Sequence, residues 1–129
     1  MKKLVLVGLF VVGSSVNLMA DWVTGAMDCD HPSGSSKKTV FIVKGKGNDL
    51  GQTGRGLAMA AFLNAEYAVE TERYCKSGKI WSSSTTVFSH NSKSKNNKKF
   101  SELIKRYKDH SWAKKIIIVK NGYDESDWR

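Results

Sequence analysis

One stretch of the sequence, residues 54–75, restricts the fold more than any other: it reads GRGLAMAAFLNAEYAVETERYC. Its first half carries Met59, Phe62 and Leu63 among alanines, so apolar side chains cover most of the circumference of a helix, and such a helix is buried. Its second half alternates polar and apolar residues, which is typical of a strand. We therefore expect a core helix that leads directly into a strand ending at Cys75.

The first twenty residues have the organisation of a signal peptide. A basic MKK precedes a short apolar segment, and a polar run follows that ends in Ala20. This arrangement is typical of an export signal, and its apolar part is shorter than the roughly twenty residues of a membrane-spanning helix. We expect residues 1–20 to be removed and residues 21–129 to form one small domain in a secreted or periplasmic protein without a stable membrane anchor. An uncleaved anchor is the alternative.

Cys29 and Cys75 are the two cysteines of the chain, and both lie in the part expected to be exported. In an oxidising compartment two cysteines most simply pair, so we expect a disulfide. It would stabilise the fold by about 3–4 kcal/mol through the loop that it closes. Asp28, Asp30 and His31 flank Cys29 and carry metal-ligating atoms, but three polar residues in one loop more often form a solvated turn. We predict neither a metal nor another cofactor.

Strand and helix patterns recur along the rest of the chain. The β-branched and aromatic run 39–45 predicts a strand, the 3–4 spacing of apolar residues over 98–108 predicts an amphipathic helix, and the continuous apolar run 116–119 is typical of a strand buried on both faces. The polar run 90–99 predicts an exposed basic loop, and residues 121–129 predict a frayed tail.

A positive charge is the main feature of the expected mature protein. The chain carries 21 Lys and Arg against 12 Asp and Glu, and two of the lysines lie in the signal peptide, so the mature charge is +7. Such a charge favours acidic partners, but the export signal makes nucleic acid an unlikely one. The candidate basic surface consists of Lys93, Lys95, Lys98, Lys99, Lys105 and Arg106.

A turn at 76–79 predicts a hairpin whose second strand covers residues 80–89. This strand carries an aromatic ring and a run of short hydroxyl side chains, the residue types that line carbohydrate sites. The candidate ligand-binding residues are Trp81, Ser82, Ser83 and Thr85.

Titratable residues leave a catalytic alternative open. Two carboxylates, Glu70 and Glu72, would share one face of the expected strand, and the chain has three histidines, His31, His90 and His110. General acid–base catalysis requires that such groups lie within hydrogen-bond reach of a substrate. No motif establishes this, so we predict no catalytic residue.

The order helix–strand–cysteine–turn–tryptophan over residues 53–89, after an early Trp-x-Thr-Gly from Trp22 to Gly25, resembles the B subunits of subtilase-cytotoxin and pertussis-like toxins. The later segment KKFSELIKRYKDHSWAKKIIIVKN is similar to the helix-then-strand segment of enterotoxin B subunits. The resemblance covers about two-thirds of the expected mature chain. It implies a small oligomer-binding (OB)-like barrel that binds glycans, forms rings and has no catalytic activity.

The expected fold is therefore α+β, with a mostly antiparallel, barrel-like sheet of about five strands and two helices. The expected function is recognition of a glycan or of a protein partner, with a homo-oligomer as one expected state. A nuclease-like hydrolase that uses the histidines and glutamates is one alternative, and an exported inhibitor or immunity protein is another.

Overall fold

The computed structural model describes residues 22–48, 52–81 and 85–128, and these form an α+β fold. The described residues form three α-helices and four strands, and a short 3-10 helix closes the described part. In chain order they are β1 (Trp22–His31), β2 (Gly34–Lys46), α1 (Gln52–Glu66), α2 (Ala68–Tyr74), β3 (Thr85–His90), α3 (Lys93–Lys108), β4 (Ala113–Asp124) and η3 (Glu125–Asp127).

The four strands form one open, mixed sheet in the order β3-β1-β2-β4. β1 pairs antiparallel with β2 and β3, whereas β4 pairs parallel with β2. The described strands do not close into the expected barrel-like sheet of about five strands. The described residues also form three α-helices and not the expected two. A parallel pair needs a long crossover connection, and here the helices supply it.

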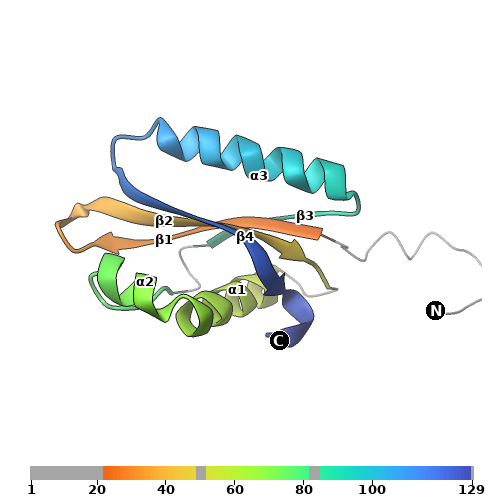
Figure 1. Cartoon of the computed structure of the whole chain (residues 1–129), viewed down its shortest axis with the longest axis horizontal. Coiled ribbons are helices and arrows are strands. Elements are labelled where there is room, and N and C mark those ends of the chain that lie inside the picture. Colours follow the sequence, from red (N-terminus) through yellow and green to blue (C-terminus); the bar gives the residue numbers. More distant parts are fainter. Residues whose placement is uncertain (1–21, 49–51, 82–84, 129) are drawn as a thin grey trace, which may run out of the picture.

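Helices cover both faces of the sheet, with α3 on one face and α1 and α2 on the other (Figure 1). The central strand β2 shows why this arrangement forms. Phe41 and Val43 pack in the cluster with α1, whereas Val40 and Ile42 pack in the cluster with α3, and all four side chains are fully buried. The expected alternation of this strand is confirmed, and each face needs its own helix layer.

Residues 68–74 form helix α2, so the strand expected there is wrong. The backbone N–H of Thr71 donates to the carbonyl of Tyr67, and that of Cys75 donates to the carbonyl of Thr71. Thr71 and Cys75 are buried, and Tyr67 packs against the same cluster. This spacing of four residues is that of a helix face, and it prevails over the local alternation.

Residues 93–99 form the first turns of α3 and not the expected basic loop. The Ser92 hydroxyl caps the helix by accepting a hydrogen bond from the N–H of Lys95. Asn96 is only 1% exposed, and its side chain donates to the carbonyl of Val23 at 3.0 Å. The other end of its amide lies 3.0 Å from Nδ1 of His90. Residues 93–99 contain no apolar side chain, so the buried amide of Asn96 attaches the start of α3 to β1 and β3.

The C-terminal residues up to Trp128 complete β4 and form η3, and two of them, Tyr123 and Glu125, are buried, which corrects the expected frayed tail. Glu125 is fully buried, and its carboxylate accepts hydrogen bonds from Nε of Arg55 at 3.1 Å and from the N–H of Asn48 at 2.7 Å. Tyr123 and Trp128 pack against the ring of Phe62 in α1. The end of the chain thus closes the α1 side of the core.

The run 116–119 is a strand as expected, but its burial on both faces is not found. Because β4 is the last strand of the sheet, Ile118 is 38% exposed, and only Val119 of this run is fully buried.

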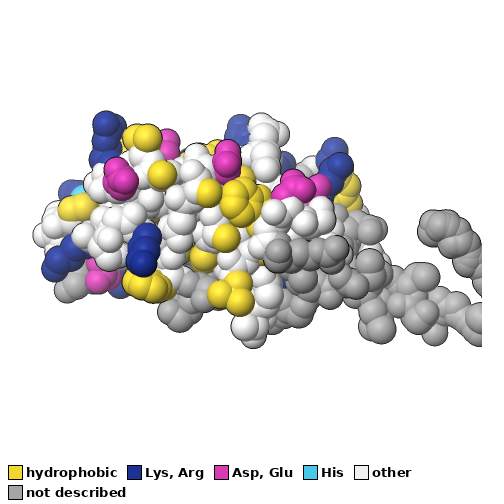
Figure 2. All heavy atoms as spheres, turned by 90° about the horizontal axis from the view of Figure 1, so that it is seen from below, with side chains coloured by type: hydrophobic (Ala, Val, Ile, Leu, Met, Phe, Trp, Pro, Cys, Tyr) yellow, Lys and Arg dark blue, Asp and Glu magenta, His cyan; other side chains and the backbone are white. Residues whose placement is uncertain are grey.

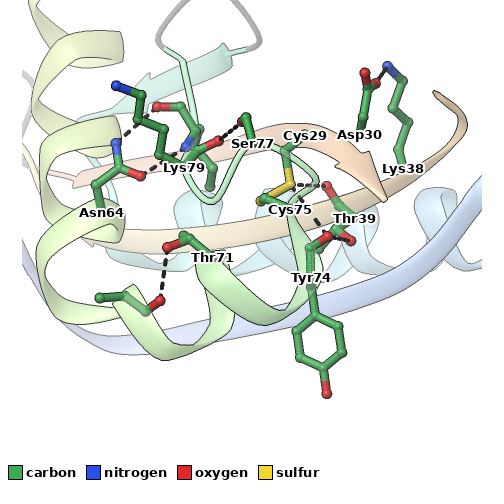
Figure 3. The surroundings of a disulfide bond; sticks show 12 residues. Cys29, Asp30, Lys38, Thr39, Asn64, Thr71, Tyr74, Cys75, Ser77 and Lys79 are labelled. Carbon is green, nitrogen blue, oxygen red and sulfur yellow. Dashed lines mark hydrogen bonds and ion pairs between the residues drawn. A yellow bond between two sulfur atoms is a disulfide. The ribbon is translucent and has the colours of Figure 1, made fainter. Parts of the chain in front are cut away.

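The expected disulfide is present. Cys29 of β1 is bonded to Cys75 at the end of α2, with their Cα atoms 5.4 Å apart (Figure 3). Beside it, the Thr39 hydroxyl donates to the carbonyl of Tyr74 at 2.6 Å, so the end of α2 is held to two strands. In the part of the chain that the structure describes, no helix is long and apolar enough to cross a membrane.

Candidate functional site: a basic groove at the start of α3

A groove of about 520 Å³ opens at one end of the sheet, between the start of α3 and the ends of β2 and β4. Four lysines, two glycines and several amide side chains surround it. The lining residues are Trp22, Lys44, Gly45, Lys46, Lys93, Asn96, Asn97, Lys120, Asn121, Gly122, Tyr123 and Asp124.

An irregularity in β4 shapes the groove. Val43 of β2 lies opposite Val119, but Gly45, two residues later, lies opposite Tyr123, so β4 has two additional residues at this point. Bulges of this kind redirect side chains, often beside functional sites. A Cβ atom at Gly45 would lie 2.2 Å from the carbonyl oxygen of Tyr123, so only glycine fits there. Gly122 has a φ of +95°, which also favours glycine.

The four lysines of the groove, Lys44, Lys46, Lys93 and Lys120, have no close carboxylate. The ion pairs found among the described residues are Lys38–Asp30 and Arg55–Glu125, so none of the four has a described carboxylate within 4.0 Å. Instead, Nζ of Lys44 donates to Oδ1 of Asn97 at 3.0 Å. Asp124 also lines the groove and lies opposite Lys46 in the sheet, so an anion there would meet four lysines against one carboxylate.

One carboxylate, Asp124, and one aromatic ring, Trp22, border the groove beside these lysines. The Ser126 side chain and backbone hydrogen-bond Asp124 and lower the pKa of its carboxyl group, and Lys46 lowers it further. Nζ of Lys93 lies 5.4 Å from the ring centroid of Trp22, within cation–π distance. This ring provides one flat wall beside the positive charges.

The helix terminus adds to the positive potential. The start of a helix carries partial positive charge, which acidic residues commonly offset. The first turn of α3 has no acidic residue, and Lys93 and Lys95 are exposed there. This end of the helix therefore combines the lysine charges with its own dipole.

The predicted basic surface overlaps this groove at one residue, Lys93. The other predicted members lie along α3, and Nζ of Lys99 lies over the ring of Phe88 at 4.1 Å. Sequence reasoning missed Lys44, Lys46 and Lys120, because they become neighbours only through the parallel pairing of β2 with β4. By contrast, acidic and basic side chains are interspersed on the face covered by α1 and α2 (Figure 2).

A second hollow, of about 380 Å³, contains one of the predicted ligand-binding residues. Trp81 lines it and is 57% exposed, with Nζ of Lys79 4.2 Å from its ring centroid. Ser82 and Ser83 lie outside the described residues, and Thr85 is the first residue of β3. The lining residues are Asp28, Cys29, Asp30, Lys76, Ser77 and Trp81.

The carboxylates of this hollow differ in environment. Asp30 forms an ion pair with Lys38 (Figure 3). Burial raises the pKa of the Asp28 carboxyl group, and the charge of Lys38 only partly opposes this effect. No group of three or more His, Cys, Asp or Glu residues in the described ranges is arranged to hold a metal ion.

The structure does not gather the histidines of the catalytic alternative. His90 pairs with the first residue of β1, whereas His31 is the last residue of that strand. Ten residues of extended chain separate these positions by about 30 Å. His110 follows α3 and stacks on Trp112 with centroids 5.0 Å apart. Glu70 and Glu72 lie in α2, which covers the face of the sheet opposite to α3.

Comparisons with known proteins identify no relative. No family model matches the chain, and neither the search of curated proteins nor that of solved structures finds a significant match.

Proposed function

We propose that this chain is an exported, non-catalytic recognition module that binds an acidic protein partner through the basic groove at the start of α3. The observation that carries the proposal is the group of four lysines without a described carboxylate within 4.0 Å, beside a helix terminus with no acidic residue in its first turn. The export signal and the expected mature charge of +7 support it.

The physical reason is the cost of holding these charges together. Lysines that face one groove repel each other and the positive end of α3, and surface charges of this kind are normally interspersed with acidic ones. A carboxylate-rich partner surface would offset that repulsion on binding. Complementary charge also accelerates encounter, so the association should weaken as salt increases.

Binding of a fluorescent poly-glutamate chain tests this proposal. The double variant Lys93→Gln/Lys120→Gln should weaken binding about tenfold, because two charge contacts of up to about 1 kcal/mol each are lost. The matched control Lys105→Gln/Lys108→Gln removes the same charge at the far end of α3 and should bind almost as the native protein does. Equal losses in the two variants would mean that net charge alone, and not the groove, attracts the probe.

An exported inhibitor or immunity protein that acts on an acidic enzyme is one form of this proposal. Its partner should co-purify at low salt and dissociate at high salt. The hydrolase alternative has no comparable support, since the histidines lie apart and no short contact joins them to Glu70 or Glu72 among the described residues.

Glycan binding at the hollow beside Trp81 is a second candidate function. The exposed ring lies with Ser77 and two aspartates, and the disulfide residue Cys29 also lines this hollow. Aromatic faces stack on sugar rings, and carboxylates and hydroxyls bind sugar hydroxyl groups. A glycan array should give signals that Trp81→Ala abolishes, and a silent array would remove this candidate. Under this second candidate, the resemblance to toxin B subunits adds ring assembly, which light scattering would show as an oligomer, whereas the acidic-partner proposal expects a monomer.

A further inference from the structure

The outer edge of β4 is open. Among the described residues, β4 is the last strand of the sheet and pairs with β2 alone (Figure 1). It has 12 residues, whereas the strand at the opposite edge, β3, has six. An edge strand presents unpaired backbone N–H and C=O groups that can pair with another chain, and proteins commonly protect such edges by keeping them short. β4 is long for a strand in that position.

Apolar side chains accompany this open backbone. Ile118 is 38% exposed and Val69, on α2, is 67% exposed. Ile116 and Ile117 are half-buried. A hollow of about 310 Å³ lies between α2 and β4, and its lining residues are Val69, Glu70, Arg73, Tyr74, Lys115, Ile116 and Ile117. An added strand would thus find both backbone partners and apolar contacts.

Positive charge lies at both ends of this apolar segment. Lys114 and Lys115 precede it and Lys120 follows it. Nζ of Lys115 lies 4.7 Å from the ring centroid of Tyr74, on the α2 side of the hollow. Lys120 also lines the basic groove. The open edge therefore continues into the groove, and both would contact a single extended chain.

We propose that an extended segment of the acidic partner adds to the sheet as a fifth strand along β4. Its apolar residues would lie opposite residues 116–118, and its acidic residues would lie at both ends, with one end in the basic groove. This inference rests on the proposed function and names the form of the partner. A second copy of this chain fits less well. If two β4 strands paired antiparallel about Ile117, Lys114 of each copy would lie opposite Lys120 of the other, and like charges in such positions are destabilising.

A synthetic peptide tests this mode of binding. The probe has alternating valine and threonine residues between pairs of glutamates. Paired strands rise equally, by about 3.3 Å per residue, so a peptide of about nine residues covers the edge from Lys114 to Lys120. It is measured by fluorescence anisotropy with the protein expressed from its full coding sequence. The variant Val69→Glu/Ile118→Glu should weaken binding at least tenfold, because it adds negative charge along the edge. The control Leu57→Glu adds a negative charge at a side chain that is 57% exposed on α1 and does not line this hollow, and the variant should bind normally.

Two further measurements separate the possible results. A peptide of the same sequence with N-methylated backbone amides should not bind, because it cannot pair as a strand, and this test needs no variant to fold. Poly-glutamate should still bind Val69→Glu/Ile118→Glu. Normal peptide binding by that variant would overturn the fifth strand and leave the groove proposal intact, whereas normal binding of both probes by Lys93→Gln/Lys120→Gln would overturn the groove proposal.

Self-association is the remaining outcome. Light scattering should show a monomer for the protein alone. A dimer that Ile118→Glu converts to a monomer would show that a second copy occupies the edge, and the proposal would then be wrong.

Discussion

Asp28 shows how one partly buried charge can lower the stability of the fold. It is half-buried on β1 beside the disulfide, and it has no ion-pair partner within 4.0 Å among the described residues. Burial raises the pKa of its carboxyl group above the ordinary value of 3.8. The folded chain therefore binds this proton more tightly than the unfolded chain does, so stability falls as pH rises through the interval between the two pKa values.

We predict that Asp28→Asn raises the free energy of unfolding at pH 7 by at most about 1 kcal/mol, since water still screens half of the group. The gain should disappear below the ordinary pKa of 3.8, where the carboxyl group is protonated in both states. Urea unfolding at several pH values measures it. Asp30→Asn is the matched control: it removes the ion pair with Lys38 and should not stabilise the protein at pH 7. A gain that is the same at all pH values would contradict this account.

Helix α3 carries basic residues at both of its ends, and these stabilise one end and destabilise the other. Its last turn carries three basic residues, which suit the negative end of a helix, whereas its first turn carries lysines and no acidic residue. Ser92 caps the helix through the N–H of Lys95, so a glutamate at position 95 would complete a capping box. This element thus retains positive charge where stability alone favours negative charge, as expected of an anion-binding surface.

We predict opposite effects for two exposed lysines of α3. Lys95→Glu should raise the free energy of unfolding by about 0.5–1 kcal/mol, because it favours the dipole and forms the capping box, and Lys108→Glu should lower it by a similar amount. Thermal and urea unfolding at low salt measure both. If the two variants shift stability in the same direction, net charge and not the helix dipole determines the effect.

The disulfide links two parts of the chain that are distant in sequence. It joins β1 to the end of α2 and spans a sequence separation of 46 residues, most of which form β2 and α1. We predict that Cys29→Ala/Cys75→Ala lowers the free energy of unfolding by about 4 kcal/mol, because the unfolded chain regains the freedom that the closed loop removes. Reduction of the native protein should produce a similar shift in urea unfolding. A loss below about 1 kcal/mol would mean that contacts between α2 and the strands already restrict this segment.

How far the sequence predicted the fold depends on the length of each pattern. The alternation around Phe41 and the helical spacing around Leu103 were sufficient, since each pattern persists over several apolar residues. In residues 68–74 alternation and helical spacing compete over two turns, and the buried contact of Thr71 decides the result. At the start of α3 the docking residue is Asn96, which no hydrophobic pattern identifies.

The sequence by itself determined the cysteine pair, the central strand, the apolar helix and the excess of positive charge, because each depends on residue type and local spacing. Only the tertiary structure decided that the sheet stays open, that β4 is its edge, and that Lys44, Lys93 and Lys120 line one groove. The parallel pairing of β2 with β4 brings together segments separated by more than 70 residues, and two additional residues in β4 shape the groove. Such long-range pairing depends on how both helix layers cover the sheet, and no local pattern encodes it.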